Sequence, residues 1–488
     1  MSLAEVSDSI PSLASELRSR SDEALLELFN ARPDLVTPVP SDIASLAARA
    51  TSTPSLLRAI ETLNLWQYQV LIATAVADEP FTYSDIAALT LPTSKKVLDH
   101  LYSLALIYKE GSGFRVPRSL RELIGDQPAG LGPRSASSFD LKVLKKAPSG
   151  AKELLDRLTW GPARGNIGDA KAKGGPIEWL LENKLLILID SKTVALPLEV
   201  GLALRGGKVH RELQESQPAL ETTKVKPDAV ERASLASIST VLRWVEELAN
   251  FWSEETPNVI QSGGLGVRDL RKIAEHLDVE EACAAFVAEI AFITGLIAID
   301  GGSVLPTLNF DLWLNKSAEE RWRDLAASWR TTSRVAGLIG RSESRNLTAL
   351  GNELDRANAS LIREHVLDLL VQGESNSAPT LDSIVKAVLW RYPHKRGVSI
   401  TTQLVEWTLR ESEWLGITGA GALSRFGALF LEEAKSLKID ASMPKPVDHI
   451  LIQSDNTAIA PGPLTSTIAE QLSTFADIES RGGATVYR

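Results

Sequence analysis

The sequence predicts a mainly α-helical protein built from tandem winged helices, which are helix-turn-helix units closed by a β-hairpin, with a small α+β domain at the C-terminal end. Three observations support this fold class. Apolar residues recur at helical spacing over most of the 488 residues. A pattern of helices followed by a short β-prone hairpin recurs at unequal spacing. From residue 448 the pattern changes to β-prone runs around one helix.

Residues 1–65 are expected to form a helical N-terminal unit. The stretch "SDEALLELFNARPDL" begins with Ser21 as an N-cap and ends before Pro33. The stretch "SDIASLAARA" is a second expected helix, with Ser41 as its N-cap. We therefore expect short amphipathic helices that bury one apolar face.

Residues 66–130 contain the pattern in its clearest form. Three helices are expected in "WQYQVLIATAVA", "TYSDIAALT" and "TSKKVLDHLYSLALI". The following "YKEGSGFRVP" is a β-prone run, a Gly-Ser-Gly turn and a return run. Three helices closed by a hairpin predict the first winged helix.

The same pattern predicts three further winged helices, at 150–207, at 236–330 with a following helix, and at 358–432. Their hairpins are expected in "ILIDSKTVALP", "AIDGGSVLPTLNF" and "TGAGALSRFGALFLEE". The unequal spacing excludes a solenoid of fixed period. Polar, Pro-rich or Gly-rich linkers are expected at about 128–149, 207–235, 331–358 and 433–447.

Residues 448–488 are expected to form the small α+β domain. "DHILIQSDNTAIAPG" contains two β-prone runs around an Asp455-Asn456 turn, "LTSTIAEQLSTFADIE" predicts a helix, and "GGATVYR" is a final β-prone run. That run reaches the last residue, so the sequence leaves open whether the native chain continues beyond residue 488.

Composition restricts the compartment and the partners. The formal net charge of −10 excludes a whole-molecule basic field, so nucleic-acid binding would require local patches. The single cysteine, Cys283, excludes an internal disulfide and a thiolate-rich metal site. We expect a cytoplasmic protein, with nucleoid association left open. The acidic N-terminus does not resemble a signal peptide, and no apolar run reaches about 18 residues, so no membrane partner is expected.

Enzyme signatures are absent from the sequence. The glycine clusters at 263–269 and 301–306 lack the lysine and hydroxyl of a phosphate loop. The six histidines show no metal-ligand spacing, and no Gly-x-Ser-x-Gly elbow occurs. We therefore predict a protein that is not an enzyme, with no catalytic residues, no cofactor and no metal site.

Local basic patches make nucleic acid the predicted partner. In the first winged helix, Lys95 and Lys96 lie on the third helix, and the hairpin carries Lys109 and Arg115. The densest cluster lies in the fourth winged helix, where cations accompany two aromatic rings that could stack on bases: Trp390, Arg391, Tyr392, His394, Lys395 and Arg396. Charged runs are more often a solvated surface, and that interpretation stays open for each patch.

The third winged helix has the opposite charge. Its carboxylates would repel phosphate, so a structural or protein-binding role is expected there: Asp278, Glu280, Glu281 and Glu289. Most of the tryptophans have core spacing on helices and are expected to be buried rather than to stack on a ligand: Trp160, Trp179, Trp244, Trp252, Trp313, Trp322 and Trp329.

Several stretches resemble a known family. "PAGLGP", "LTWGPARG", "PIEWLLENKLLILIDSKTVALPLEVGLALRGG" and "GGLGVRDLRKIA" are similar to actinobacterial helicase-associated proteins. Residues 450–488 resemble the start of the N-terminal domain of XPB-like helicases. The resemblance implies tandem winged helices followed by a small α+β domain, which in the helicases precedes the ATPase motor and contacts DNA or partners. Motor motifs do not occur in this sequence, so no catalytic residue is carried over.

These observations lead to a primary hypothesis and two alternatives. The first is a non-enzymatic, helicase-associated DNA-binding protein of DNA repair or transcription. The second is an interaction scaffold for a helicase, nuclease or RNA polymerase, without direct DNA contact. The third is the N-terminal part of a longer helicase-like protein.

Overall fold

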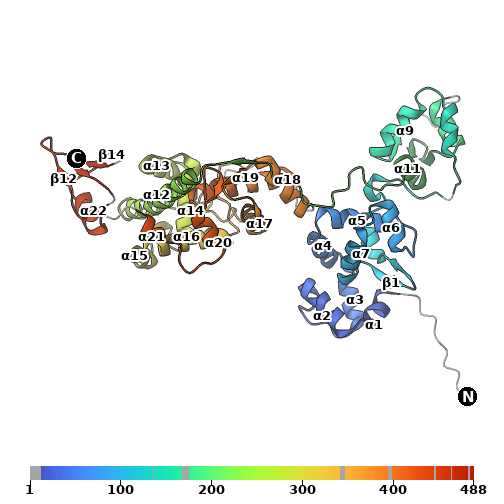
Figure 1. Ribbon diagram of the computed structural model, residues 1–488, viewed down its shortest axis with the longest axis horizontal. Coiled ribbons are helices and arrows are strands. Elements are labelled where there is room, and N and C mark those ends of the chain that lie inside the picture. Colours follow the sequence, from blue (N-terminus) through green and yellow to red (C-terminus); the bar gives the residue numbers. More distant parts are fainter. Residues whose placement is uncertain are drawn as a thin grey trace, which may run out of the picture. The chain divides into compact units, whose positions relative to one another are not determined.

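Helices dominate the computed structural model (Figure 1), which describes residues 12–135, 137–167, 175–340, 347–393, 398–443, 447–462, 464–481 and 484–488. Over these residues it contains 22 α-helices and 15 short strands, so the predicted mainly α-helical class is confirmed. The strands form only small antiparallel sheets. None of the described helices is long and apolar enough to cross a membrane.

The chain divides into two compact lobes. The first lobe comprises residues 1–218 together with 387–396, and the second comprises residues 219–386 together with 397–488. Four short 3₁₀ helices accompany the α-helices in the described residues: η1 (Pro33–Leu35), η2 (Pro128–Gly130), η3 (Leu141–Lys146) and η4 (Ala336–Leu338).

The first lobe begins with four short helices, as the sequence predicts for its N-terminal unit. The first three surround a small apolar core, and the fourth packs into the core of the helices that follow. The four helices are α1 (Leu13–Ser19), α2 (Asp22–Ala31), α3 (Ile43–Ala50) and α4 (Thr53–Glu61). The Ser21 side chain accepts the Ala24 N–H and caps α2, as expected. The cap of α3 is Asp42 rather than the predicted Ser41, because the Asp42 carboxylate accepts the Ser45 N–H at 2.7 Å.

The next part of the first lobe contains three helices, a hairpin and a fourth helix. They are α5 (Leu65–Val76), α6 (Tyr83–Leu89), α7 (Ser94–Ser103), β1 (Tyr108–Glu110), β2 (Gly113–Arg115) and α8 (Arg118–Ile124). Between α5 and α6, Phe81 exchanges backbone hydrogen bonds with Phe114, at 3.0 Å and 2.8 Å. This exchange places a short extended segment beside β2, on the side opposite β1.

Three further segments also have helices before a β-hairpin and one helix after it, and we number the four segments repeats 1 to 4, at residues 65–124, 151–204, 227–314 and 359–431. Among the described residues of repeat 2, two helices rather than three precede the hairpin. Repeat 2 contains α9 (Ala151–Trp160), β3 (Arg164–Asn166), α10 (Pro176–Glu182), β4 (Ile187–Asp190), β5 (Thr193–Ala195) and α11 (Leu198–Leu204). Repeat 3 contains α12 (Pro227–Glu254), α13 (Val267–Leu277), α14 (Glu281–Ile293), β7 (Ile297–Asp300), β8 (Ser303–Pro306) and α15 (Leu308–Leu314). Repeat 4 contains α17 (Ala359–Gln372), β9 (Ser377–Pro379), α18 (Leu381–Arg391), α19 (Val398–Trp414), β10 (Thr418–Gly419), β11 (Ala422–Leu423) and α20 (Arg425–Leu431).

The turn between the last long helix and the hairpin is the most uniform feature of the repeats. One residue of this turn has a positive φ in every repeat: Ala105 (55°), Lys184 (59°), Gly295 (75°) and Gly416 (73°). In repeat 1 the Leu106 N–H then donates to the Leu101 carbonyl at 3.0 Å, five residues back, which is the Schellman helix end. Equivalent bonds, at 2.9 Å, join Leu185 to Leu180 and Leu296 to Ala291. Repeats 1 to 3 therefore turn from helix into strand in the same way, and repeat 4 shares the positive φ at Gly416.

The second lobe is organised around α12. This helix begins at Pro227, inside the segment that composition assigned to a linker, because Pro227 occupies a favourable first helical position and Val230, Ser234 and Ile238 give the helix a buried face. It packs against α14 and against α16 (Ala318–Thr331), beside which it lies in Figure 1. It also contacts β10 of repeat 4, so one helix supports both repeats of this lobe.

Two smaller features complete the second lobe. The linker strand β6 (Thr222–Lys224) pairs with β9, and the short helix α21 (Ile439–Ser442) contacts α16. The C-terminal segment contains β12 (Leu451–Ile452), β13 (Ala458–Ala460), α22 (Ser466–Ser473), β14 (Ile478–Arg481) and β15 (Thr485–Tyr487), in the sheet order β12-β13-β15-β14. The predicted Asp455-Asn456 turn is present, since Asp455 Oδ1 accepts the Thr457 N–H at 3.1 Å and Asn456 has a φ of 65°.

Arg32 anchors the N-terminal helices on repeat 1. Its guanidinium is buried and donates to the Leu104 carbonyl at 2.9 Å, the Ala50 carbonyl at 3.0 Å and Ser55 Oγ at 2.6 Å. Burial lowers the pKa of Arg32 to about 10, which still leaves the group charged at neutral pH.

Replacing Arg32 by alanine is expected to lower the unfolding free energy of the first lobe by about 2–3 kcal/mol, because three buried acceptors lose their donor. Urea unfolding of the full chain, followed by hydrogen exchange of α2 to α4 amides, measures the loss. The exposed Arg58 on α4 is the matched control and should cost less than about 0.5 kcal/mol. Equal effects of the two substitutions would contradict the anchoring role.

Candidate nucleic-acid interface

Helix α7 presents the two lysines that the sequence singled out. Val97, Leu98 and Leu101 are buried, so the helix packs by one side and leaves the other to solvent. Lys95 and Lys96 both lie on the exposed side, in the first turn. The ammonium groups are therefore accessible at the start of the helix that precedes the hairpin.

A cluster of aromatic rings supports these cations. Tyr83 and Tyr102 contact Phe114, with ring centroids 5.2 Å and 6.2 Å apart. Lys95 Nζ lies 5.3 Å from the centroid of Tyr83, and Lys109 Nζ lies 4.8 Å from that of Tyr102. The structure thus brings a lysine of α7 and a lysine of β1 onto one aromatic cluster. The sequence did not indicate that these rings belong to the site.

Both tyrosine hydroxyls are donors to carboxylates. Tyr83 Oη donates to Asp99 at 2.6 Å, and Tyr102 Oη donates to Glu16 at 2.5 Å. Burial, reinforced by these hydrogen bonds, raises the pKa of Tyr83 and of Tyr102 to about 12, so both phenols are neutral at physiological pH. Asp99 is exposed on α7 near Lys95 and Lys96, and it reduces the positive charge of this face.

Arg115 is placed differently from the lysines. Its guanidinium pairs with Glu110 on the neighbouring strand and lies 3.4 Å from Glu79 Oε2. Glu79 also accepts from Arg121 and, at 2.8 Å, from the Val116 N–H. Arg115 therefore belongs to an ion-pair network that holds the hairpin against the segment before Phe81, and its charge is compensated locally.

The aromatic and basic stretch at 390–396 is only partly described. Trp390 Nε1 donates to the Gln214 carbonyl at 2.8 Å and its ring packs on the core of the first lobe, and Tyr392 is buried. Arg391 donates to the Thr62 carbonyl at 3.1 Å, at the end of α4. In this conformation the two rings and the arginine make contacts within the lobe. His394, Lys395 and Arg396 lie outside the described residues.

The corresponding helices of the other repeats are less suited to phosphate. In repeat 3, α14 is buried from Cys283 to Ala291, so it cannot enter a groove without leaving the core. In repeat 2, α10 carries Glu178 and Glu182. In repeat 4, the exposed side of α19 includes Gln403 and Glu406. Repeat 1 is thus the only described copy whose pre-hairpin helix exposes a pair of lysines.

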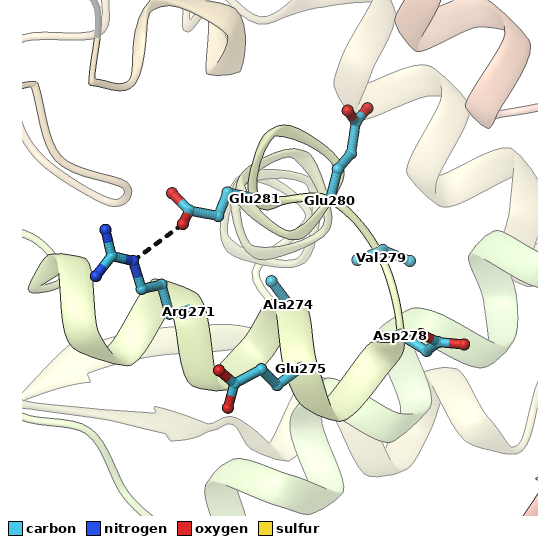
Figure 2. Close-up of a pocket in the computed structure, with 7 residues that line it drawn as sticks. All are labelled: Arg271, Ala274, Glu275, Asp278, Val279, Glu280 and Glu281. Atoms are coloured by element: carbon cyan, nitrogen blue, oxygen red, sulfur yellow. Dashed lines mark hydrogen bonds and ion pairs between the residues drawn. The ribbon is translucent and has the colours of Figure 1, made fainter.

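A depression between α13 and α14 illustrates the contrast. Figure 2 shows it lined by Arg271, Ala274, Glu275, Asp278, Val279, Glu280 and Glu281. Arg271 pairs with Glu281 at 3.0 Å across it, and Glu280 accepts from Arg410 on α19. The rim of this depression is mainly acidic, in contrast to the two lysines exposed on α7 of repeat 1.

Neither a metal centre nor a known relative assigns a function. Among the described residues, no group of three or more His, Cys, Asp or Glu side chains could hold a metal ion. No protein-family model and no curated protein matches the chain. The geometry of repeat 1 is therefore the basis for a proposed function.

Proposed function

We propose that this protein binds duplex DNA through repeat 1 and is a non-enzymatic, tandem winged-helix protein. The order of elements supports the fold proposal. A winged helix places a short strand after its first helix, and this strand pairs with the second strand of the wing. Repeat 1 shows this pairing between Phe81 and Phe114, and repeat 2 shows it between β3 and β5. In repeats 3 and 4 the equivalent contacts join Asn258 to Ser303 and β9 to β11.

The positions of Lys95, Lys96 and Lys109 are the main support for DNA binding. In a winged helix the pre-hairpin helix enters the major groove and the wing contacts the adjacent backbone. These lysines lie on those two elements, and Lys95 and Lys109 contact one aromatic cluster. Ammonium groups at such positions neutralise phosphates and fix the register of the protein on the duplex.

The part played beside a helicase rests on resemblance alone. The C-terminal sheet, with its order β12-β13-β15-β14, lies in residues 450–488, which resemble the start of the N-terminal domain of XPB-like helicases. The proposal is that this segment connects DNA-bound repeats to a helicase in repair or transcription, inside the cell. Co-sedimentation of the full chain with purified helicase, in the presence and absence of DNA, tests this part separately.

Replacing Lys95, Lys96 and Lys109 by alanine is expected to weaken DNA binding and to flatten its salt dependence. Each lost phosphate contact reduces the slope of log K against log salt by about 0.9, so the triple variant should lose about 2.7. Fluorescence anisotropy of a labelled duplex, titrated with the full chain over a series of salt concentrations, measures the slope.

A variant with alanine at Lys142, Lys145 and Lys146 is the matched control. It removes the same charge from exposed lysines of η3, which the proposal leaves off the interface, so its slope should match that of the wild type. If the wild-type chain shifts no duplex at low salt, or if both variants have the same slope, the proposed site is wrong.

A further inference from the structure

Repeat 3 exposes two leucines on the helix that follows its hairpin. Leu308 is 83% exposed and Leu312 is 64% exposed, and they are four residues apart on α15. Residues at this spacing lie on the same side of a helix. The preceding hairpin adds Leu305, which is 37% exposed. Phe310 and Trp313 hold the opposite side of α15 in the core, so the helix is firmly placed.

The same helix in repeat 1 shows what these positions contain when they face only water. The first and fifth residues of α8 are Arg118 and Glu122, which form an ion pair of 2.8 Å with side chains 92% and 62% exposed. The first and fifth residues of α15 are Leu308 and Leu312. The two helices follow equivalent hairpins, so the leucines replace a solvated ion pair. Adjacent exposed leucines of this kind mark an interaction surface rather than isolated surface residues.

The charge around the leucines identifies the complementary partner. Asp300 is exposed at the tip of the preceding hairpin, and Lys316, the cation nearest to α15 along the chain, is paired with Asp324 at 2.6 Å. Asp311 lies beside the leucines on α15, and it forms no ion pair with any described residue. A two-fold pairing of α15 with a second copy would bring two Asp311 carboxylates together. A cationic partner instead gains electrostatic complementarity.

We propose that Leu308, Leu312 and Asp311 form a docking surface for a basic amphipathic helix of another protein. The partner helix would place apolar residues at i and i+4 against the leucines and a lysine or arginine near Asp311. This surface lies in repeat 3, and its function goes beyond the DNA binding proposed for repeat 1. It gives the chain separate elements for nucleic acid and for protein.

The test uses the full chain and labelled synthetic helices, followed by fluorescence anisotropy without DNA. One peptide carries leucines at i, i+4 and i+7 with lysines on its flanks, and the second has glutamates in place of the lysines. The lysine peptide should bind at least about tenfold more tightly than the glutamate peptide at low salt. Replacing both leucines by serine (L308S/L312S), which leaves the charge unchanged, should lower its affinity at least about tenfold.

Leu26→Ser is the matched control, because Leu26 is an isolated leucine, 60% exposed, on α2 of the first lobe. It should leave peptide binding unchanged. The proposal is overturned if the lysine peptide does not bind saturably, or if L308S/L312S binds it as the wild type does. It is also overturned if the wild-type chain sediments as a dimer that L308S/L312S converts to a monomer, since the occupant would then be a second copy.

Discussion

Replacing Arg334 by alanine is expected to lower the unfolding free energy of the second lobe by about 3–5 kcal/mol, because it leaves a buried carboxylate without its cation. Glu289 lies on α14 and is 3% exposed. Arg334 Nε and Nη2 donate to its two oxygens at 2.7 Å and 3.0 Å. The remaining bond described for this carboxylate is the Leu350 N–H, at 2.5 Å. The same guanidinium also donates to the Gly351 carbonyl at 2.9 Å, so the variant loses this hydrogen bond as well.

Urea unfolding monitored by tryptophan fluorescence measures this loss, because seven of the eleven tryptophans lie in the second lobe: Trp244, Trp252, Trp313, Trp322, Trp329, Trp407 and Trp414. Arg271→Ala is the matched control. Its ion pair with Glu281, at 3.0 Å, is exposed and should contribute less than about 1 kcal/mol.

A double variant separates the charge effect from packing. Replacing Glu289 and Arg334 together by methionine removes both charges and keeps much of the volume, so it should recover most of the stability lost in Arg334→Ala. A double variant as unstable as the single variant would show that packing around residue 334, not the uncompensated carboxylate, accounts for the loss.

Helices and hairpins were predictable because their signals are local. The hairpin strands of repeats 1 and 2 lie inside the predicted stretches, β7 of repeat 3 begins one residue before its stretch, and α7 lies inside the third helix predicted for residues 66–130. The main difference is α12, whose first turns were assigned to a linker. Its first turns contact β10, which lies far away in the sequence. The contact between α12 and β10 therefore could not be predicted from the composition of residues 207–235.

The sequence shows which residues of the candidate site are charged, but it does not show which of them are neutralised by an ion pair. Lys95, Lys96 and Lys109 are exposed, as a solvated basic face requires. Arg115 has the same sequence signal, yet Glu79, which lies far from it in the sequence, joins Glu110 in compensating its charge. The burial of the tryptophans was likewise predicted only in part. Trp252, Trp313, Trp322 and Trp329 are buried as predicted, whereas Trp160 is 40% exposed and lies under Arg205.

Replacing Gly416 by alanine is expected to cost about 3–5 kcal/mol, far more than the same change at Gly295. Both glycines occupy the positive-φ position before a hairpin. A Cβ at Gly416 would lie 2.5 Å from the Ser234 carbonyl oxygen and 2.7 Å from Ile238 Cγ1, both on α12. The nearest neighbour of a Cβ at Gly295 would be Asn309 Nδ2, at 3.7 Å. Both positions have the strained positive-φ backbone, but only a Cβ at Gly416 would also clash with α12.

Repeats 1 and 2 show that a residue with a side chain can adopt this positive-φ conformation. Ala105 and Lys184 hold the same conformation with side chains present, so the fold tolerates a Cβ there, and Gly295→Ala should cost about 1–2 kcal/mol. The converse change, Ala105→Gly, relieves that strain but adds backbone entropy to the unfolded chain, so its net effect should be within about 1 kcal/mol. Urea unfolding of the three variants decides the matter. Equal losses at positions 295 and 416 would mean that α12 yields to the added methyl group, and the close packing of this helix on repeat 4 would not be what holds the second lobe together.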